Sequence, residues 1–137
     1  MYKIKKIEEG HLGLFATKDI REGAIILYLT QDSTYIPYPT RTSIQVENRH
    51  LEHYEGGCTN HHCNPSAKII IHPNFQGQNP GAQWETSLSV LLVAKKNIEV
   101  GEEITFDYET TEFELAEPFE CNCHGRWIRG KIHRYQE

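Results

Sequence analysis

A run of six residues, 60–65, concentrates side chains that could do chemistry. It reads Asn-His-His-Cys-Asn-Pro and follows the Gly-Gly pair at 56–57. Amide, imidazole and thiol groups packed this densely can bind a ligand, hold a metal or position a reacting group. The alternative is a turn with local hydrogen bonds, which accounts for Asn64 and Pro65 but not for the whole cluster. The pattern therefore predicts a site here.

A second candidate is the segment 101–108, which reads Gly-Glu-Glu-Ile-Thr-Phe-Asp-Tyr. A glycine turn followed by strand-forming residues predicts a short strand over 104–106, with Tyr108 just beyond it among acidic residues. Taken alone this is a weak indication of function, because a tyrosine near a strand is more often a packing residue than a catalytic one.

Together, and in this order, the two segments resemble the SET-domain family of protein-lysine methyltransferases. Residues 60–65 are similar to the family's Asn-His-Ser-Cys-x-Pro-Asn motif, with His62 in place of serine and Ser66 in place of the final asparagine. Residues 101–108 resemble its Gly-Glu-Glu-Leu-Thr-x-x-Tyr strand almost residue for residue. This ordered pair is the specific part of the resemblance.

Two weaker segments extend the resemblance over roughly residues 3–135. Residues 12–16 resemble the family's amino-terminal cofactor loop and the strand that leaves it, although His11 stands where the family usually has glycine. The carboxy-terminal residues resemble its post-SET tail. We therefore expect a SET domain over residues 1–115 and a tail over 116–137, within one globular unit.

The tail resemblance rests on Cys121 and Cys123. In the family, three tail cysteines join the motif cysteine, here Cys63, around a zinc ion, but Ile128 replaces the third tail cysteine. The resemblance thus implies a zinc site with an open fourth position, because structural zinc takes four nitrogen or sulfur ligands. Without a fourth ligand the cysteines would simply pack as small apolar residues. Candidates for the fourth ligand are His124, His133 and Cys58.

The resemblance also implies roles for individual residues. Tyr108 aligns with the catalytic tyrosine, whose hydroxyl and ring orient the lysine amine and stabilise the positive methyl group during transfer. S-adenosylmethionine would contact the Asn60 side chain and the His61 backbone, with further main-chain contacts from Leu12 and Gly13. Tyr108 would also border the cofactor.

The target lysine is expected to enter a narrow channel from the face opposite the cofactor. Its pKa is near 10.4, so an apolar channel that disfavours the ammonium form helps it to lose a proton. Tyr28 falls where the family often places a second, catalytic channel tyrosine, and a core strand tyrosine is the alternative. Trp127, in the tail, could form a channel wall or be a surface aromatic.

The elements that must position these residues are mostly short strands. Glycines at 10 and 13 bracket a turn, and turn residues separate the later apolar runs. The fold class is therefore mainly β, and the resemblance implies small curved antiparallel sheets with a carboxy-terminal pseudoknot that brings Asn60 to Tyr108. We expect strands at 2–7, 14–16, 24–29, 43–46, 68–72, 88–94 and 104–106, a loop at 73–83 and a short helix at 112–116.

Composition narrows the class of partner. The 137 residues carry a formal net charge of -5, which disfavours direct nucleic-acid binding and suits a basic protein segment, such as a histone tail, as the lysine substrate. With no apolar signal segment or membrane-spanning run, we expect a soluble intracellular protein. Two alternatives stay open, a catalytically inactive SET-like or zinc-knuckle module that binds a protein or nucleic acid, and a disulfide-stapled extracellular domain.

Overall fold

The computed structural model describes residues 1–8, 10–74 and 87–134. Within these ranges short strands form four small sheets, and no helix has the length and apolar composition needed to cross a membrane. The predicted mainly β fold is confirmed. The elements are β1 (Tyr2–Glu8), β2 (His11–Ala16), β3 (Ile25–Tyr28), β4 (Thr34–Ile36), β5 (Ile44–Val46), β6 (Arg49–Glu52), α1 (Tyr54–Gly57), β7 (Asn60–His61), β8 (Ala67–Asn74), β9 (Ser87–Ala94), β10 (Glu103–Phe106), the 3-10 turn η1 (Tyr108–Thr110), β11 (Phe119–Glu120), β12 (Trp127–Ile128) and α2 (Lys131–Arg134).

The four-stranded sheet, in the order β1-β2-β10-β7, carries both motifs. The first three strands are antiparallel neighbours, whereas β10 runs parallel to β7. In this parallel pair Thr105 lies beside Asn60, and Phe106 lies beside His61. Residues more than 40 positions apart in the sequence thereby become neighbours. Tyr108 lies two residues after Phe106, the end of β10.

The structure corrects the expected turn between the two glycines of the first hairpin. Gly10 lies in the turn, with a φ of 75° that glycine tolerates, but Gly13 lies inside β2. A Cβ on Gly13 would come within 2.7 Å of Ile7 Cδ1 and 2.9 Å of Glu103 Oε2. Glycine is needed there because side chains crowd the strand.

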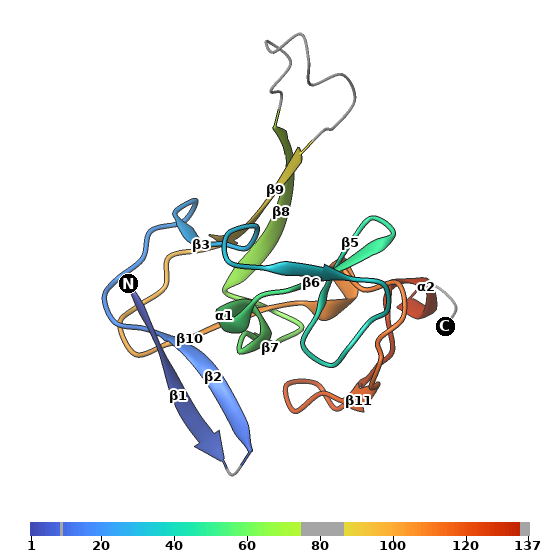
Figure 1. Ribbon diagram of the computed structural model, residues 1–137. Coiled ribbons are helices and arrows are strands. Elements are labelled where there is room, and N and C mark those ends of the chain that lie inside the picture. The colour runs from blue at the N-terminus through green and yellow to red at the C-terminus, as the bar shows by residue number, and fades with distance from the viewer. Residues whose placement is uncertain (9, 75–86, 135–137) are drawn as a thin grey trace, which may run out of the picture.

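The sheet β3-β9-β8 contains the strands predicted at 24–29, 88–94 and 68–72. Figure 1 shows its β8–β9 hairpin as a long arm that projects from the rest of the molecule. Pro73 belongs to β8 rather than to the predicted loop at 73–83, most of which lies outside the described residues.

The third sheet, β4-β6-β5, was only partly expected from the sequence. The predicted strand at 43–46 corresponds to β5, but β4 and β6 were missed. Each has only three or four residues, too few for a periodic pattern to identify. Long-range pairing of Tyr35 with Leu51, and of Ile44 with the same Leu51, makes them strands.

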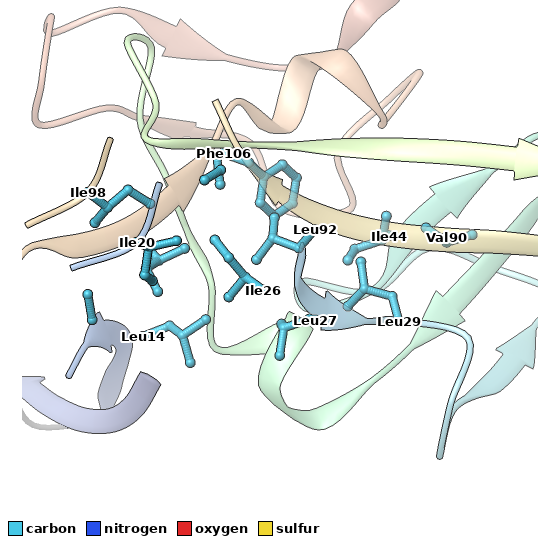
Figure 2. Close-up of a cluster of buried hydrophobic side chains, with 14 of the residues drawn as sticks. Leu14, Ile20, Ile26, Leu27, Leu29, Ile44, Val90, Leu92, Ile98 and Phe106 are labelled. Carbon is cyan, nitrogen blue, oxygen red and sulfur yellow. The ribbon is translucent and has the colours of Figure 1, made fainter. Parts of the chain in front are cut away.

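One cluster of buried apolar side chains joins these sheets, as Figure 2 shows. Leu14 from β2, Leu27 from β3 and Leu92 from β9 are all at most 3% exposed, and burying each such side chain stabilises the fold by about 1.5–3 kcal/mol. Phe106, the last residue of β10, belongs to the same cluster. The core therefore fixes the strand end from which Tyr108 projects.

The helix predicted at 112–116 is absent from the structure. The Phe113 backbone N–H donates to Gln45 Oε1, and the Leu115 N–H donates to the Arg129 carbonyl, so distant groups take the hydrogen bonds that a helix would use. Helical turns instead form at η1 and at α2, which had not been predicted. The Phe113 bond ties the carboxy-terminal segment to β5, and the Leu115 bond joins two parts of that segment to each other.

Candidate active site

The two motifs meet at a cavity of about 760 Å³, a volume typical of small-molecule sites. Its walls come from the tip of the β1–β2 hairpin, the loop before β5, β7, the end of β10 and the tail. A smaller cavity of about 350 Å³ shares part of this wall and also includes Leu12. The residues common to both are His11, Arg41, Thr42, Gly57 and Asn60.

Tyr108 lies in the wall of the larger cavity, in an aromatic environment. Its hydroxyl donates a hydrogen bond of 2.7 Å to the Thr59 carbonyl, and its ring lies 5.0 Å from that of Phe106 and 6.0 Å from that of Phe119. Burial raises the pKa of the Tyr108 phenol, so the hydroxyl stays protonated at neutral pH. It therefore offers oxygen lone pairs to a guest and cannot act as a general base.

The Asn60 side chain is held by three hydrogen bonds within the protein. Its Nδ2 donates to the Leu12 carbonyl at 2.9 Å and to Glu103 Oε2 at 2.8 Å, and its Oδ1 accepts from His11 Nε2 at 3.0 Å. Both amide hydrogens are thus in use. What remains for a ligand is the second lone pair of Oδ1, which suits a donor such as an ammonium group.

His61 presents its main chain rather than its ring. The side chain is only 2% exposed although the residue as a whole is half-buried, and the ring packs edge-on against Tyr108 and Phe119. The Tyr108 backbone N–H donates to His61 Nδ1 at 3.0 Å. The ring therefore packs against the catalytic candidate, and the exposed part of His61, which is a residue of the cavity wall, is its main chain.

The remaining predicted site residues are more dispersed. Leu12 lines the smaller cavity and is exposed, whereas Gly13 is buried and lines neither cavity. Tyr28 is 52% exposed at the end of β3 and is not among the described residues that line either cavity. Its catalytic role stays a prediction. Trp127 is likewise 52% exposed and outside the described cavity walls, which favours a surface aromatic.

Three cysteines from the motif and the tail converge beside this site. Cys63 Sγ lies 3.7 Å from Cys121 Sγ, and the Cys63 backbone N–H points at Cys123 Sγ at 3.4 Å. The fourth nearby donor is His61, whose Nε2 is 3.3 Å from Cys63 Sγ, and all four donor atoms lie within 4.8 Å of one another. Neither Cys58 nor His124 belongs to this described group, and the His133 side chain lies outside the description.

This donor set fits a zinc ion. Bonds of about 2.3 Å in a tetrahedron place two sulfurs about 3.8 Å apart, close to the observed distance between Cys63 and Cys121. Burial alone would raise the pKa of the Cys121 thiol, but backbone N–H groups of Arg126 and His124 and the neighbouring thiols lower it to about 7. Thiolate, the form that binds metal, is therefore accessible at Cys121.

One proton must move before His61 can join such a site. Its Nδ1 accepts from a backbone N–H, so Nε2 carries the ring proton and points it at Cys63. A zinc ligand needs a bare Nε2 and a proton on Nδ1, which would break the bond from the Tyr108 N–H and leave Asp107 Oδ1, 3.7 Å away, as the nearby carboxylate for that proton. Burial lowers the pKa of His61, which favours the neutral ring that either arrangement requires.

Two features of this site were not identified from the sequence. His61 was assigned only to the cofactor, although its His-x-Cys spacing from Cys63 was a visible signal for a shared ligand set. Arg41, in the loop before β5, gave no signal at all. Its place in the wall of both cavities results only from the fold.

Comparisons with known proteins agree with this geometry. A family model described as "SET domain" matches residues 11–109, which include β7, β10 and Tyr108. A crystal structure from Plasmodium falciparum, of a protein named as a histone methyltransferase, is similar in fold with a TM-score of 0.59 and 23% identity, over 79% of this chain and 96% of that one. A search of curated proteins found no significant match. The match over most of the chain shows that this protein belongs to the SET-domain family.

Proposed function

We propose that this protein is a methyltransferase that uses S-adenosylmethionine to methylate the side-chain amine of lysine in a protein. Members of the SET-domain family are generally protein-lysine methyltransferases. The observation that carries the proposal is the convergence of Tyr108, Asn60 and the His61 main chain on one cavity, across more than 40 residues of sequence. If Tyr108, Asn60 and His61 served only to pack the protein interior, they would not all need to line the same cavity.

The described cavity wall suits this cofactor, which supplies a methyl group activated on a positively charged sulfonium. We propose that Asn60 Oδ1, the His61 main chain and Leu12 at the neighbouring cavity hold it. Five glutamates line the larger cavity and favour cationic guests. They are Glu8, Glu103, Glu112, Glu117 and Glu120.

Tyr108 would position the lysine amine. Its hydroxyl hydrogen is committed to the Thr59 carbonyl, so the phenolic oxygen can accept a hydrogen bond from the amine and attract positive charge that develops near it. The rings of Phe106 and Phe119 would form an apolar environment that disfavours the ammonium form. The side chains thus orient the amine and promote its neutral, nucleophilic state.

The charge of the same surface supports a basic protein segment as the substrate. Glu8, Glu117 and Glu120 are exposed at the cavity and would attract a basic segment around the target lysine. A histone tail is one such segment. The Plasmodium falciparum protein of similar fold is named a "putative histone methyltransferase", so histones are the first proteins to test.

The test is transfer of labelled methyl from S-adenosylmethionine to a panel of basic proteins, histones included. Tyr108→Phe removes the phenolic oxygen and keeps the ring, so we expect the turnover rate to fall by about a hundredfold or more. Tyr38→Phe, at a tyrosine that is 62% exposed and outside the described cavity walls, should label like the native chain.

Equal labelling by Tyr108→Phe and the native chain would remove Tyr108 from the reaction. A native chain that binds no S-adenosylmethionine would overturn the proposed activity and favour the binding-module alternative. Isothermal titration measures cofactor binding directly. It therefore distinguishes a chain that binds no cofactor from an active chain whose substrate is missing from the panel.

A further inference from the structure

Arg41 is the one lysine or arginine among the described residues that line either cavity. It stands in the wall common to both, together with His11 and Asn60. The surrounding charge is otherwise acidic, with five glutamates around the larger cavity and Glu52 at the smaller one. A lone guanidinium in such a wall distinguishes one part of the site from the rest.

The guanidinium has no hydrogen bond or ion pair to any residue in the part of the chain that the structure describes. The nearest obvious partner, Glu52, is already engaged, because the hydroxyls of Thr40 and Thr42 both donate to it. Burial raises the pKa of Tyr108 and of the Cys58 thiol, and the charge of Arg41 opposes that rise in both. Arg41 is therefore within electrostatic reach of both cavities and is open to a ligand.

The backbone that carries Arg41 is held in place by its own side chains. Thr40 Oγ1 accepts from the backbone N–H of Ser43 at 3.1 Å, and Ser43 Oγ accepts from the Thr40 N–H at 2.8 Å. Together with the threonine bonds to Glu52, these contacts fix the loop on both sides of Arg41. A loop fixed in this way can aim one charged side chain at a fixed place.

We propose that Arg41 binds the carboxylate of the cofactor's methionine moiety and selects for cofactors that carry it. The inference rests on the proposed function and names a residue for one group of its cofactor. S-adenosylmethionine has a sulfonium and an ammonium, which the glutamates suit, and a single carboxylate, which they repel. Arg41 is the complementary group, because a planar guanidinium can bind a carboxylate through two parallel hydrogen bonds.

The test compares two ligands by isothermal titration on the full chain, S-adenosylmethionine and its decarboxylated analogue. The native chain should bind S-adenosylmethionine about tenfold more tightly, the lower range for charge-assisted hydrogen bonds at an open site. Arg41→Ala should lose most of this preference by weakening only the binding of S-adenosylmethionine. Arg21→Ala removes the same charge from an exposed residue outside the described cavity walls, and it should keep the preference.

Equal affinity of the native chain for the two ligands would overturn the inference without any variant, as would an unchanged preference in Arg41→Ala. Either result leaves the proposed methyltransferase intact, since the chain still binds the cofactor. A native chain that binds neither ligand overturns the proposed function itself. Circular dichroism of each variant excludes loss of folding as the cause of weaker binding.

Discussion

The side chains of this site differ in how many of their hydrogen-bonding groups remain free. Tyr108 has committed its hydrogen to Thr59, and Asn60 has committed both amide hydrogens to Leu12 and Glu103. Each therefore faces a ligand as an acceptor. A cationic cofactor and a lysine amine are both donors, so the protein's internal hydrogen bonds already select the polarity of the guest.

The substitution Asn60→Asp tests whether the two hydrogen bonds donated by the Asn60 amide matter. The change replaces an N–H donor 2.8 Å from Glu103 Oε2 by a carboxylate oxygen, so two negative charges would face each other. We expect a loss of about 1–3 kcal/mol in the free energy of unfolding. We also expect at least tenfold weaker binding of S-adenosylhomocysteine, because the carboxylate repelled by Glu103 would leave the position in which Asn60 Oδ1 faces the ligand. Urea unfolding and titration calorimetry measure the two effects.

Asn97→Asp is the matched control, because Asn97 uses its oxygen to accept from the Glu22 backbone N–H and aspartate can do the same. Its unfolding and ligand binding should be close to native. Native-like behaviour of Asn60→Asp would mean that the amide hydrogens of Asn60 do not matter.

At the scale of elements, the tail is attached to the site by one buried carboxylate. Glu109, 2% exposed in η1, accepts the backbone N–H groups of Arg129 and Gly130 at 3.1 Å and pairs with the Arg126 guanidinium at 2.7 Å. Gly130 passes so close to the chain that a Cβ there would lie 2.2 Å from the Phe113 carbonyl oxygen. The tail that supplies Phe119 and two cysteines is thereby locked against η1.

The pH dependence of stability should report this attachment. Burial opposes ionisation of Glu109, but hydrogen bonds from Gly130 and Arg126 lower its pKa overall. A carboxyl with a lowered pKa in the folded state stabilises it above the ordinary glutamate pKa of about 4.3, and that contribution is lost as the pH falls through the folded pKa. Glu109→Gln should therefore be about 3 kcal/mol less stable at pH 7 and should lose less of its stability on acidification.

Urea unfolding of both proteins between pH 7 and about pH 3 measures the difference. Glu99→Gln, at an exposed glutamate, should keep the native pH profile. A Glu109→Gln profile parallel to the native one would show that Glu109 gains nothing from its partners.

At the scale of the whole molecule, the cluster of three cysteines and His61 connects the motif at residues 60–65 to the carboxy-terminal tail. Cys63 comes from the segment after β7, whereas Cys121 and Cys123 come from the tail, about 60 residues later. Arg126 connects this cluster to the tail attachment, because its guanidinium also lies 3.8 Å from Cys63 Sγ. A metal here would hold the tail over the cavity rather than take part in the chemistry.

We expect about one zinc ion per chain when the protein is purified under reducing conditions. Mass spectrometry of the metal content should show its loss in Cys121→Ser and Cys123→Ser, with a lower melting temperature because the bound metal contributes to folding. Cys58→Ala, at a cysteine outside the cluster, should retain the metal. A metal-free native chain with the same melting temperature before and after chelation would show that the cysteines only pack.

The strands and the chemistry of the two motifs could be predicted from the sequence because both are local properties. Alternation and turn residues identify the strands that became β1, β3, β8 and β9, and residues 60–65 and 101–108 hold their reactive groups within a few positions. Elements of three or four residues, such as β4 and β6, carry too little pattern and exist through pairing with distant strands.

The tertiary structure alone decided three features. Residues 112–116 are not helical because Gln45, nearly 70 positions away, takes the Phe113 N–H. His61 lies among the cysteines because β7 pairs in parallel with β10 beside the folded tail. Arg41 enters the cavity wall from a loop without any motif. Each depends on contacts between segments far apart in the chain, which no local pattern of residue types encodes, whereas the identities of the reacting groups were already present in the sequence.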